Sequence, residues 1–347
     1  MNITDPINQI LKHLPNKQAA IDLLTHARNR LLIMEGGAFH FCDLSKKNRN
    51  GQPGLLVQLT GLTRVLSDFY WPDRKLWYQN NSALAKQIKR AHNTHKCINK
   101  KKQAQRKKLQ SMDAQAAATS HVRGSIVHRQ VGNWFHMTKD QFNVHNMGGA
   151  HPQTELVFEA LEKESQILLS TEFRVACTEI GLGSAIDFVS VDARTGKLRF
   201  TELKTVPVRV SAALFALDNP TVEYSGLLHK SSLERNICAH AKLQLAICVL
   251  MLVEGMSFPH DFDTSVLLVW DDGYQWIDVD ADFYRDYAGP VYADLKEKIP
   301  EWRKEQRALA VARTHQRKIQ REMNHNNPPR VQQMDDSFDE EDIDTDE

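Results

Sequence analysis

The chain of 347 residues is 41% hydrophobic, enough for one large domain or two small ones, and no apolar run approaches the ~20 residues of a membrane span. Its five cysteines are scattered without a CxxC pair, so neither a disulfide framework nor a zinc or iron–sulfur site is predicted. The net charge of +1 conceals a basic body and an acidic end, because the last 13 residues carry nine acids and no base. A basic body suggests a polyanionic partner, and an ordinary solvated surface is the alternative that net charge leaves open. We expect an intracellular protein of the cytoplasm or nucleus, with the mitochondrion left open and no membrane contact.

The N-terminal part is expected to be a small helical leader, residues 1–54, in which apolar spacing predicts a helix over residues 17–34. The main domain is placed at residues 55–302. It begins with a short strand from Leu55 and then a helix that stops near Pro72, since a proline disfavours helical geometry in the residue before it.

The middle of the chain contains a basic stretch, residues 96–110, which is predicted to be a solvated helix or arm. Helices are expected over Ser120–Phe135 and Thr154–Ser170, the second with Thr154 as its N-cap. Three segments rich in β-branched and aromatic residues then predict strands, at Glu172–Ile180, Ser184–Asp192 and Lys197–Thr205.

The remaining elements complete an α/β pattern. A largely buried helix is expected over Leu233–Val253, followed by strands at Thr264–Trp270 and Tyr274–Asp280. A helix from Asp282 continues into a basic helical extension, residues 303–330, and the acidic tail, residues 331–347, has the composition of a disordered segment. The αβββαβ order predicts a mixed central sheet flanked by helices on both faces.

Two of the expected strands form a hairpin that carries charges near its open end. The four-residue loop ends in Gly196, so Asp192 is expected to pair with Lys197, which places Asp187 opposite Glu202. Directly opposed Cβ atoms lie about 4.5–5.5 Å apart, and like charges at that distance repel.

A divalent cation would offset this repulsion, since Mg²⁺ is usually held by one or two carboxylates. Lys204 lies two residues after Glu202 and therefore points to the same face, where its ammonium group suits a phosphate. The alternative is an exposed rim with a plain ion pair between Lys204 and Glu202.

The pattern resembles the PD-(D/E)XK nucleases, and within them the RecB-type branch. That branch has a GxxxH helix upstream, matched here by Gly124 to His128, and an ExK strand, matched by Glu202-Leu203-Lys204. It also has a glutamine in the helix after that strand, matched by Gln244. The segment LTRVLSDFYWP (62–72) is similar to the start of the mitochondrial genome maintenance exonucleases.

The resemblance implies a restriction-endonuclease-like fold and a Mg²⁺-dependent deoxyribonuclease, an exonuclease acting on ends or single-stranded segments, in which Mn²⁺ can substitute. The implied metal ligands are Asp187, Glu202, the Leu203 carbonyl and His128. Lys204 would position the attacking water, and Gln244 would orient Lys204 or a phosphate. No iron–sulfur cluster is expected, because the cysteines that hold one in some relatives are absent here.

Some features depart from the branch or allow other interpretations. Cys248 stands where the branch often has tyrosine, and Ala185-Ile186 replaces the proline that usually precedes the aspartate. His128, taken alone, is more typical of a core histidine than of a ligand. The alternative functions are a non-catalytic nucleic-acid-binding module that retains the nuclease fold, and an unrelated α/β protein with a decorated hairpin.

Basic residues close to aromatic ones are typical of single-strand binding, where bases stack and phosphates pair with cations. The candidate DNA contacts are Arg64, Arg74, Lys75, Lys100, Lys101 and Lys102. Core packing is the alternative for at least half of the aromatic rings near residues 69–78. The acidic tail is expected to compete with nucleic acid for basic surface or to recruit a basic protein partner.

Overall fold

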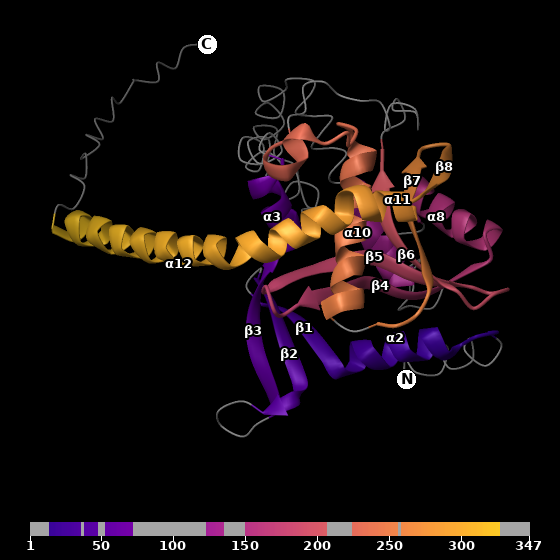
Figure 1. Cartoon of the computed structure of the whole chain (residues 1–347), viewed down its shortest axis with the longest axis horizontal. Helices are drawn as coiled ribbons and strands as arrows, with labels where there is room; N and C mark the ends of the chain where they lie inside the picture. The colour runs from indigo at the N-terminus through magenta and orange to yellow at the C-terminus, as the bar shows by residue number, and fades with distance from the viewer. Residues whose placement is uncertain are drawn as a thin grey trace, which may run out of the picture. The chain divides into compact units, whose positions relative to one another are not determined.

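The computed structural model describes residues 14–35, 38–47, 53–71, 123–134, 150–206, 224–255 and 258–326. The chain divides into two compact units, residues 1–299 and 300–347. The first unit holds all the strands (Figure 1). The expected acidic tail, the whole of the expected basic arm and five of the six expected DNA contacts, from Arg74 to Lys102, lie outside the described residues.

The N-terminal part contains more strand than was expected. After α2 (Gln18–Asn29), the chain forms the antiparallel strands β1 (Arg30–Glu35), β2 (Ala38–Lys47) and β3 (Pro53–Gly61). The predicted helix over residues 17–34 was therefore wrong beyond Asn29, and the leader is not wholly helical. A short apolar run such as Leu31–Met34 fits a buried strand as well as a helix, and periodicity alone does not separate them.

The central sheet is mixed and open. Its other strands are β4 (Gln166–Cys177), β5 (Leu182–Asp192), β6 (Leu198–Thr205), β7 (Phe262–Trp270) and β8 (Gly273–Asp278). The last residues of β3 pair parallel with β5, and β6 pairs parallel with β7; the other pairs are antiparallel. The expected α/β class, with a mixed sheet and the order α8–β4–β5–β6–α10–β7, is confirmed.

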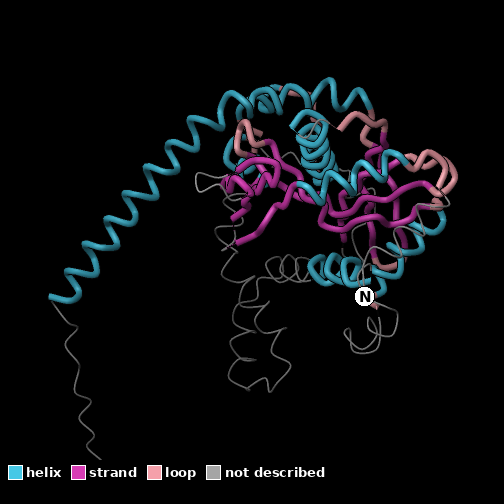
Figure 2. Tube along the Cα trace, turned by 90° about the horizontal axis from the view of Figure 1, so that it is seen from below, coloured by secondary structure: helices cyan, strands magenta, loops and turns pink. Residues whose placement is uncertain are grey.

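Helices cover both faces of the sheet, and Figure 2 shows the strands as a layer between them. On one face lie the helix at residues 123–134 and α8 (Pro152–Lys163), whose apolar side chains pack on Phe188 and Leu203. On the other lies α10 (Ile237–Gly255), which packs on Val206 and Val266. Because side chains alternate along a strand, Glu202 and Lys204 face α10.

The helix α8 differs from its prediction at both ends. Its N-cap is His151, whose Nδ1 accepts a hydrogen bond from the amide of Gln153, and not Thr154. The helix ends at Lys163, and Ser165 adopts a left-handed conformation (φ 54°) before β4 begins. The amphipathic pattern runs on through Ser170, so the pattern alone did not show the change from helix to strand.

Several other elements match their predictions. α3 (Leu62–Phe69) ends just before Pro72, and the helix at residues 123–134 lies within the expected range. After β8, the chain forms α11 (Ala281–Phe283), a π-helical turn (Tyr284–Ala288) and α12 (Gly289–Asn326). A 3₁₀ turn (Gly226–Lys230) precedes α10.

By length and composition α10 could cross a membrane, contrary to the expectation that no apolar run approaches a span. However, 61% of its most apolar window is buried inside the fold, as in the core helix of a globular domain. Three cysteines in the described part of the chain, Cys177, Cys238 and Cys248, are buried and free.

Candidate active site

The hairpin of β5 and β6 has the register that the sequence predicts. Asp192 donates its amide hydrogen to the carbonyl of Lys197, and Gly196 closes the loop in a left-handed conformation (φ 74°) that glycine adopts without strain. The ladder between the strands runs from Val191–Leu198 to Phe188–Thr201. It stops one position before Asp187 and Glu202.

The two strands separate at this position, and we call the opening between Asp187 and Glu202 the fork. From Glu202 onward, the recorded partner of β6 is β7, while the start of β5 pairs with the end of β3. The carboxylate of Asp187 accepts a hydrogen bond from the amide of Leu203, with 2.6 Å between Oδ2 and N. A side chain thus takes the backbone donor that a continuing ladder would have used.

Glu202 lies on the α10 side of the fork and is almost fully buried, with 1% of its surface exposed. Its Oε1 accepts hydrogen bonds from Lys204 and from Nε2 of Gln244 on α10, the second at 2.9 Å. Its Oε2 has no hydrogen-bond partner among the described residues. Gln244 thus holds Glu202, a contact that its expected role of orienting Lys204 or a phosphate did not include.

The ion pair between Lys204 and Glu202 is the one that the plain-rim alternative predicts. A rim carboxylate, however, would lie in solvent, and Glu202 does not. Burying a carboxylate is costly unless both of its oxygens are satisfied. Oε2 of Glu202 is therefore a buried acceptor that a bound cation or a water would satisfy.

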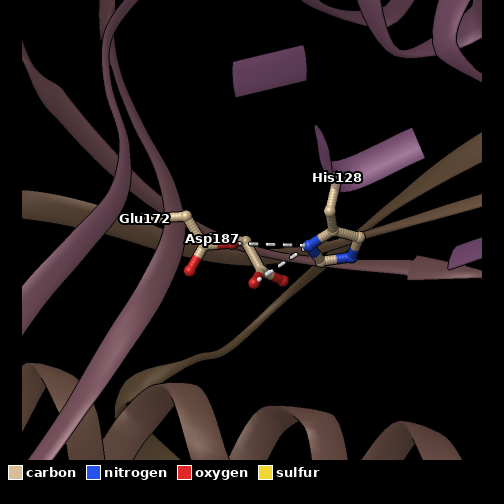
Figure 3. Close-up of side chains that lie close together, drawn as sticks. All are labelled: His128, Glu172 and Asp187. Atoms are coloured by element: carbon tan, nitrogen blue, oxygen red, sulfur yellow. Dashed lines mark ion pairs between the residues drawn. The ribbon is translucent and has the colours of Figure 1, made fainter. Parts of the chain in front are cut away.

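His128 reaches the fork from the other face of the sheet. Its helix comes very close to β6, because a Cβ on Gly124 would lie only 3.1 Å from Oγ1 of Thr205. The imidazole Nδ1 lies 3.4 Å from Oδ1 of Asp187 and 3.9 Å from Oε1 of Glu172 (Figure 3). His128 is therefore a partner of the fork and not a plain core histidine.

Glu172 is a site residue that sequence analysis missed. It lies on β4 between Thr171, which pairs with Phe188, and Phe173, which pairs with Ile186, and so stands across from Asp187. Its φ of 49° is left-handed, an uncommon conformation for a glutamate and one often found at functional sites. Ligand atoms of Glu172, His128 and Asp187 all lie within 4.8 Å of one another, close enough to hold a metal ion.

The charges of the fork are strongly coupled. Burial, helped by the charge of Asp187, raises the pKa of Glu202 to about 7. Burial alone would lower the pKa of His128, but the carboxylates of Asp187 and Glu172 outweigh it and raise that pKa to about 10. The pKa of Asp187 lies below its ordinary value despite burial, because His128 and Lys204 favour the charged carboxylate.

A buried polar network fixes the chain just after Lys204. Nε2 of Gln153 donates to the carbonyl of Val206 at 2.9 Å and to Oδ1 of Asp271 at 2.7 Å. Arg123, one residue before Gly124, reaches the same carbonyl at 3.3 Å. The end of β6 is thus tied to the His128 helix, to α8 and to the β7–β8 turn.

Of the six predicted DNA contacts, the structure describes Arg64, which is an exposed residue of α3. Cys248, at the position where the RecB-type branch often has tyrosine, is fully buried, and burial raises its thiol pKa, so it is a core residue and not a nucleophile. No family model matches the chain, and no curated protein matches it.

The donor set of the fork suits a hard divalent cation. It offers carboxylate oxygens from three neighbouring strands and one imidazole, with a lysine beside them. Mg²⁺ prefers oxygen ligands at near-octahedral geometry, and Mn²⁺ accepts the same oxygens together with imidazole.

Proposed function

We propose that this chain is a metal-dependent nuclease of the PD-(D/E)XK type, RecB-like in its motifs and restriction-endonuclease-like in its core, that hydrolyses the phosphodiester bonds of DNA. The observation that carries the proposal is the unpartnered, buried Oε2 of Glu202, beside Asp187 and Lys204. A rim ion pair or a decorated hairpin gives no reason to bury that oxygen.

The proposed ligands for Mg²⁺ are Asp187, Oε2 of Glu202 and the backbone carbonyl of Leu203. The amide of Leu203 points toward β5, where it meets Asp187. Since the N–H and C=O of one residue in a strand point to the same side, its carbonyl also faces the fork. His128 and Glu172 would complete the set or hold a second ion.

Each remaining side chain has a distinct task in this proposal. The bound metal would lower the pKa of a coordinated water and neutralise charge on the phosphate. Gln244 keeps Oε1 of Glu202 occupied, so that Oε2 is the oxygen left for the metal. Lys204 brings a positive charge to the place where charge develops on the scissile phosphate, and can orient the attacking water.

The proposed substrate is DNA, acted on from an end or in single-stranded segments. The basic body of the chain supports a polyanionic substrate. The Arg and Lys residues near 64–75 and 100–102 would bind the phosphate backbone of the DNA. The exonuclease assignment rests on the motif resemblance, as does the expectation that no iron–sulfur cluster is needed.

The test is incubation of the protein with end-labelled linear and with circular single-stranded DNA, in Mg²⁺, in Mn²⁺ and in EDTA. An exonuclease shortens the linear DNA with either metal, leaves the circle intact and is silent in EDTA. Cleavage of the circle would show an endonuclease instead. DNA that is bound but never cut would favour the non-catalytic binding module.

A further inference from the structure

The second unit of the chain begins within α12, at Pro300, and presents a strongly basic helix. Residues 303–321 contain seven arginines and lysines against one glutamate. At about 100° per residue, five of these seven basic residues fall within an arc of roughly 100°, the fifth being Arg321. We call the four whose side chains the structure describes the basic stripe: Arg303, Arg307, Arg317 and Lys318.

This part of α12 has little protein around it. Every side chain from Arg307 to Ile319 is exposed, including the apolar Leu309 and Val311, which are 48% and 70% exposed. Helices in proteins gain most of their stability from packing, and this stretch has almost none. Its alanines at 308, 310 and 312 favour helix, but they do not offset the charges.

The stripe also carries mutual repulsion. Arg303 and Arg307 are one turn apart, where like charges destabilise a helix. The pKa of the Arg303 guanidinium lies below its ordinary value, because partial burial and the neighbouring charge of Arg307 disfavour the charged form. A polyanion laid along the stripe would relieve this repulsion.

A polyanion of suitable length exists in the same chain. Residues 335–347 carry nine acids and no base. The eight residues between Asn326 and this segment can span about 30 Å, and the helix from 303 to 321 is about 27 Å long. The segment can therefore reach the stripe, and such a short tether gives an effective concentration in the millimolar range.

We propose that the acidic segment 335–347 binds the basic stripe of α12 within one molecule, and that nucleic acid must displace it there. The contact itself is independent of the nuclease proposal, whereas the competition rests on it. In this account the tail weakens DNA binding at low ionic strength and leaves the fork between β5 and β6 unchanged.

The contact is tested on the full-length chain by energy transfer between a donor dye at Leu309, which lies on the far side of the helix from the stripe, and an acceptor at the C-terminus. Salt screens exposed charges, with a Debye length of about 10 Å at 0.1 M and about 3 Å at 1 M. We expect high transfer at 20 mM salt that falls as salt rises to 1 M. In the stripe variant, with Arg307, Arg317 and Lys318 replaced by Gln, transfer should be low at every salt concentration.

A matched control variant has three exposed basic residues of the first unit, Arg129, Lys163 and Arg174, replaced by Gln. Its energy-transfer efficiency should equal that of the wild type at each salt concentration. An energy-transfer efficiency that changes neither with salt nor in the stripe variant would overturn the proposal. So would transfer that depends on protein concentration, since that result would place the tail on a second copy.

The competition is tested with a fluorescent single-stranded oligonucleotide. Replacing the nine acids of 335–347 by Asn and Gln should tighten binding about tenfold or more at 20 mM salt and leave it unchanged at 0.5 M. If the wild type and the variant bind the oligonucleotide equally well at low salt, the tail does not compete with DNA. The energy-transfer experiment then decides by itself whether the tail contacts the stripe. No DNA binding by either form would contradict the nuclease proposal, and again the contact would be judged by energy transfer alone.

Discussion

The carboxylate of Asp187 accepts the amide hydrogen of Leu203 at 2.6 Å, at the point where the ladder between β5 and β6 ends. The backbone amide of Leu203 is thereby bonded to the side chain of Asp187 instead of to a backbone carbonyl of β5. The consequence is a fork whose walls are the ends of two strands, with Glu202 buried on one side and His128 approaching from the other.

Replacing Glu172 by Gln should weaken metal binding. The left-handed glutamate stands within reach of both His128 and Asp187, and the change removes one anionic ligand at nearly constant shape. We expect the thermal stabilisation by Mn²⁺ to require about tenfold more metal. The control is Glu179→Gln, at an exposed position outside the cluster. A Glu172→Gln protein with the wild-type metal dependence would remove Glu172 from the site.

Replacing Gln244 by Met keeps the size of the side chain but removes the donor to Oε1 of Glu202. The carboxylate is then held by Lys204 alone and loses its fixed orientation. Residues that orient metal ligands typically contribute about 10- to 100-fold to affinity or activity, so cleavage should slow by that factor while the fold persists. Gln275→Met, at an exposed position on β8, serves as the matched control. An undiminished rate in Gln244→Met would contradict the role given to this residue.

The close approach of Gly124 to β6 should be measurable by a double-mutant cycle. An alanine Cβ at this position would lie 3.1 Å from Oγ1 of Thr205, so in Gly124→Ala the Thr205 side chain or the His128 helix has to shift by a few tenths of an ångström. We expect a loss of stability of about 1–2 kcal/mol and a lower cleavage rate. Adding Thr205→Ala removes the clashing oxygen and should recover part of both losses. If the two changes are simply additive, the contact does not set the helix position.

The carboxylate of Asp192 should contribute to stability only above its low pKa. It accepts hydrogen bonds from the amides of Arg194 and Thr195 and pairs with the Arg194 side chain, and these contacts lower its pKa to about 2 from 3.8. The stabilisation is therefore present above pH 4 and lost as pH falls toward 2. Asp192→Asn should cost up to about 1 kcal/mol at pH 7, because it removes the ion pair with the exposed Arg194 side chain, and nothing near pH 2. Urea unfolding at both pH values measures this difference, and an equal cost at both would contradict it.

Much of the fold and part of the site could be predicted from the sequence. The loop ending in Gly196 and the alternation of the two strands were sufficient to predict the register that places Asp187 opposite Glu202. The GxxxH match to the RecB-type branch, Gly124 to His128, implied a histidine near the acids, and His128 lies beside Asp187. The hairpin register depends on local geometry, and local patterns report local geometry well.

The features that could not be predicted depend on tertiary structure. Nothing in the residues around Glu172 signals a left-handed backbone, since it lies in a strand-like run of ordinary composition. The end of the β5–β6 ladder is set by the approach of β3, which comes from more than a hundred residues upstream. The contact of Gln244 with Glu202 depends on how α10 lies on the sheet. In each case packing between distant segments decides the outcome.

The buried carboxylate of Glu202 lowers the free energy of unfolding when no metal is bound. Its pKa of about 7 exceeds the ordinary value of 4.5, so the folded state binds this proton more tightly than the unfolded chain does. In metal-free protein the stability contributed by this group should therefore fall as pH rises from about 4.5 to about 7. Glu202→Gln removes that cost and should keep or raise metal-free stability at pH 8, by up to about 3 kcal/mol.

The most direct test is single-turnover cleavage of end-labelled DNA in Mg²⁺ by the wild type and by Glu202→Gln, with Glu159→Gln, an exposed residue of α8, as the control. We predict that the wild type and the control cleave the DNA and that the cleavage rate of Glu202→Gln is at least about a thousandfold lower. The Glu202→Gln protein should unfold at no lower a temperature than the wild type. Cleavage by Glu202→Gln at the wild-type rate would contradict the account.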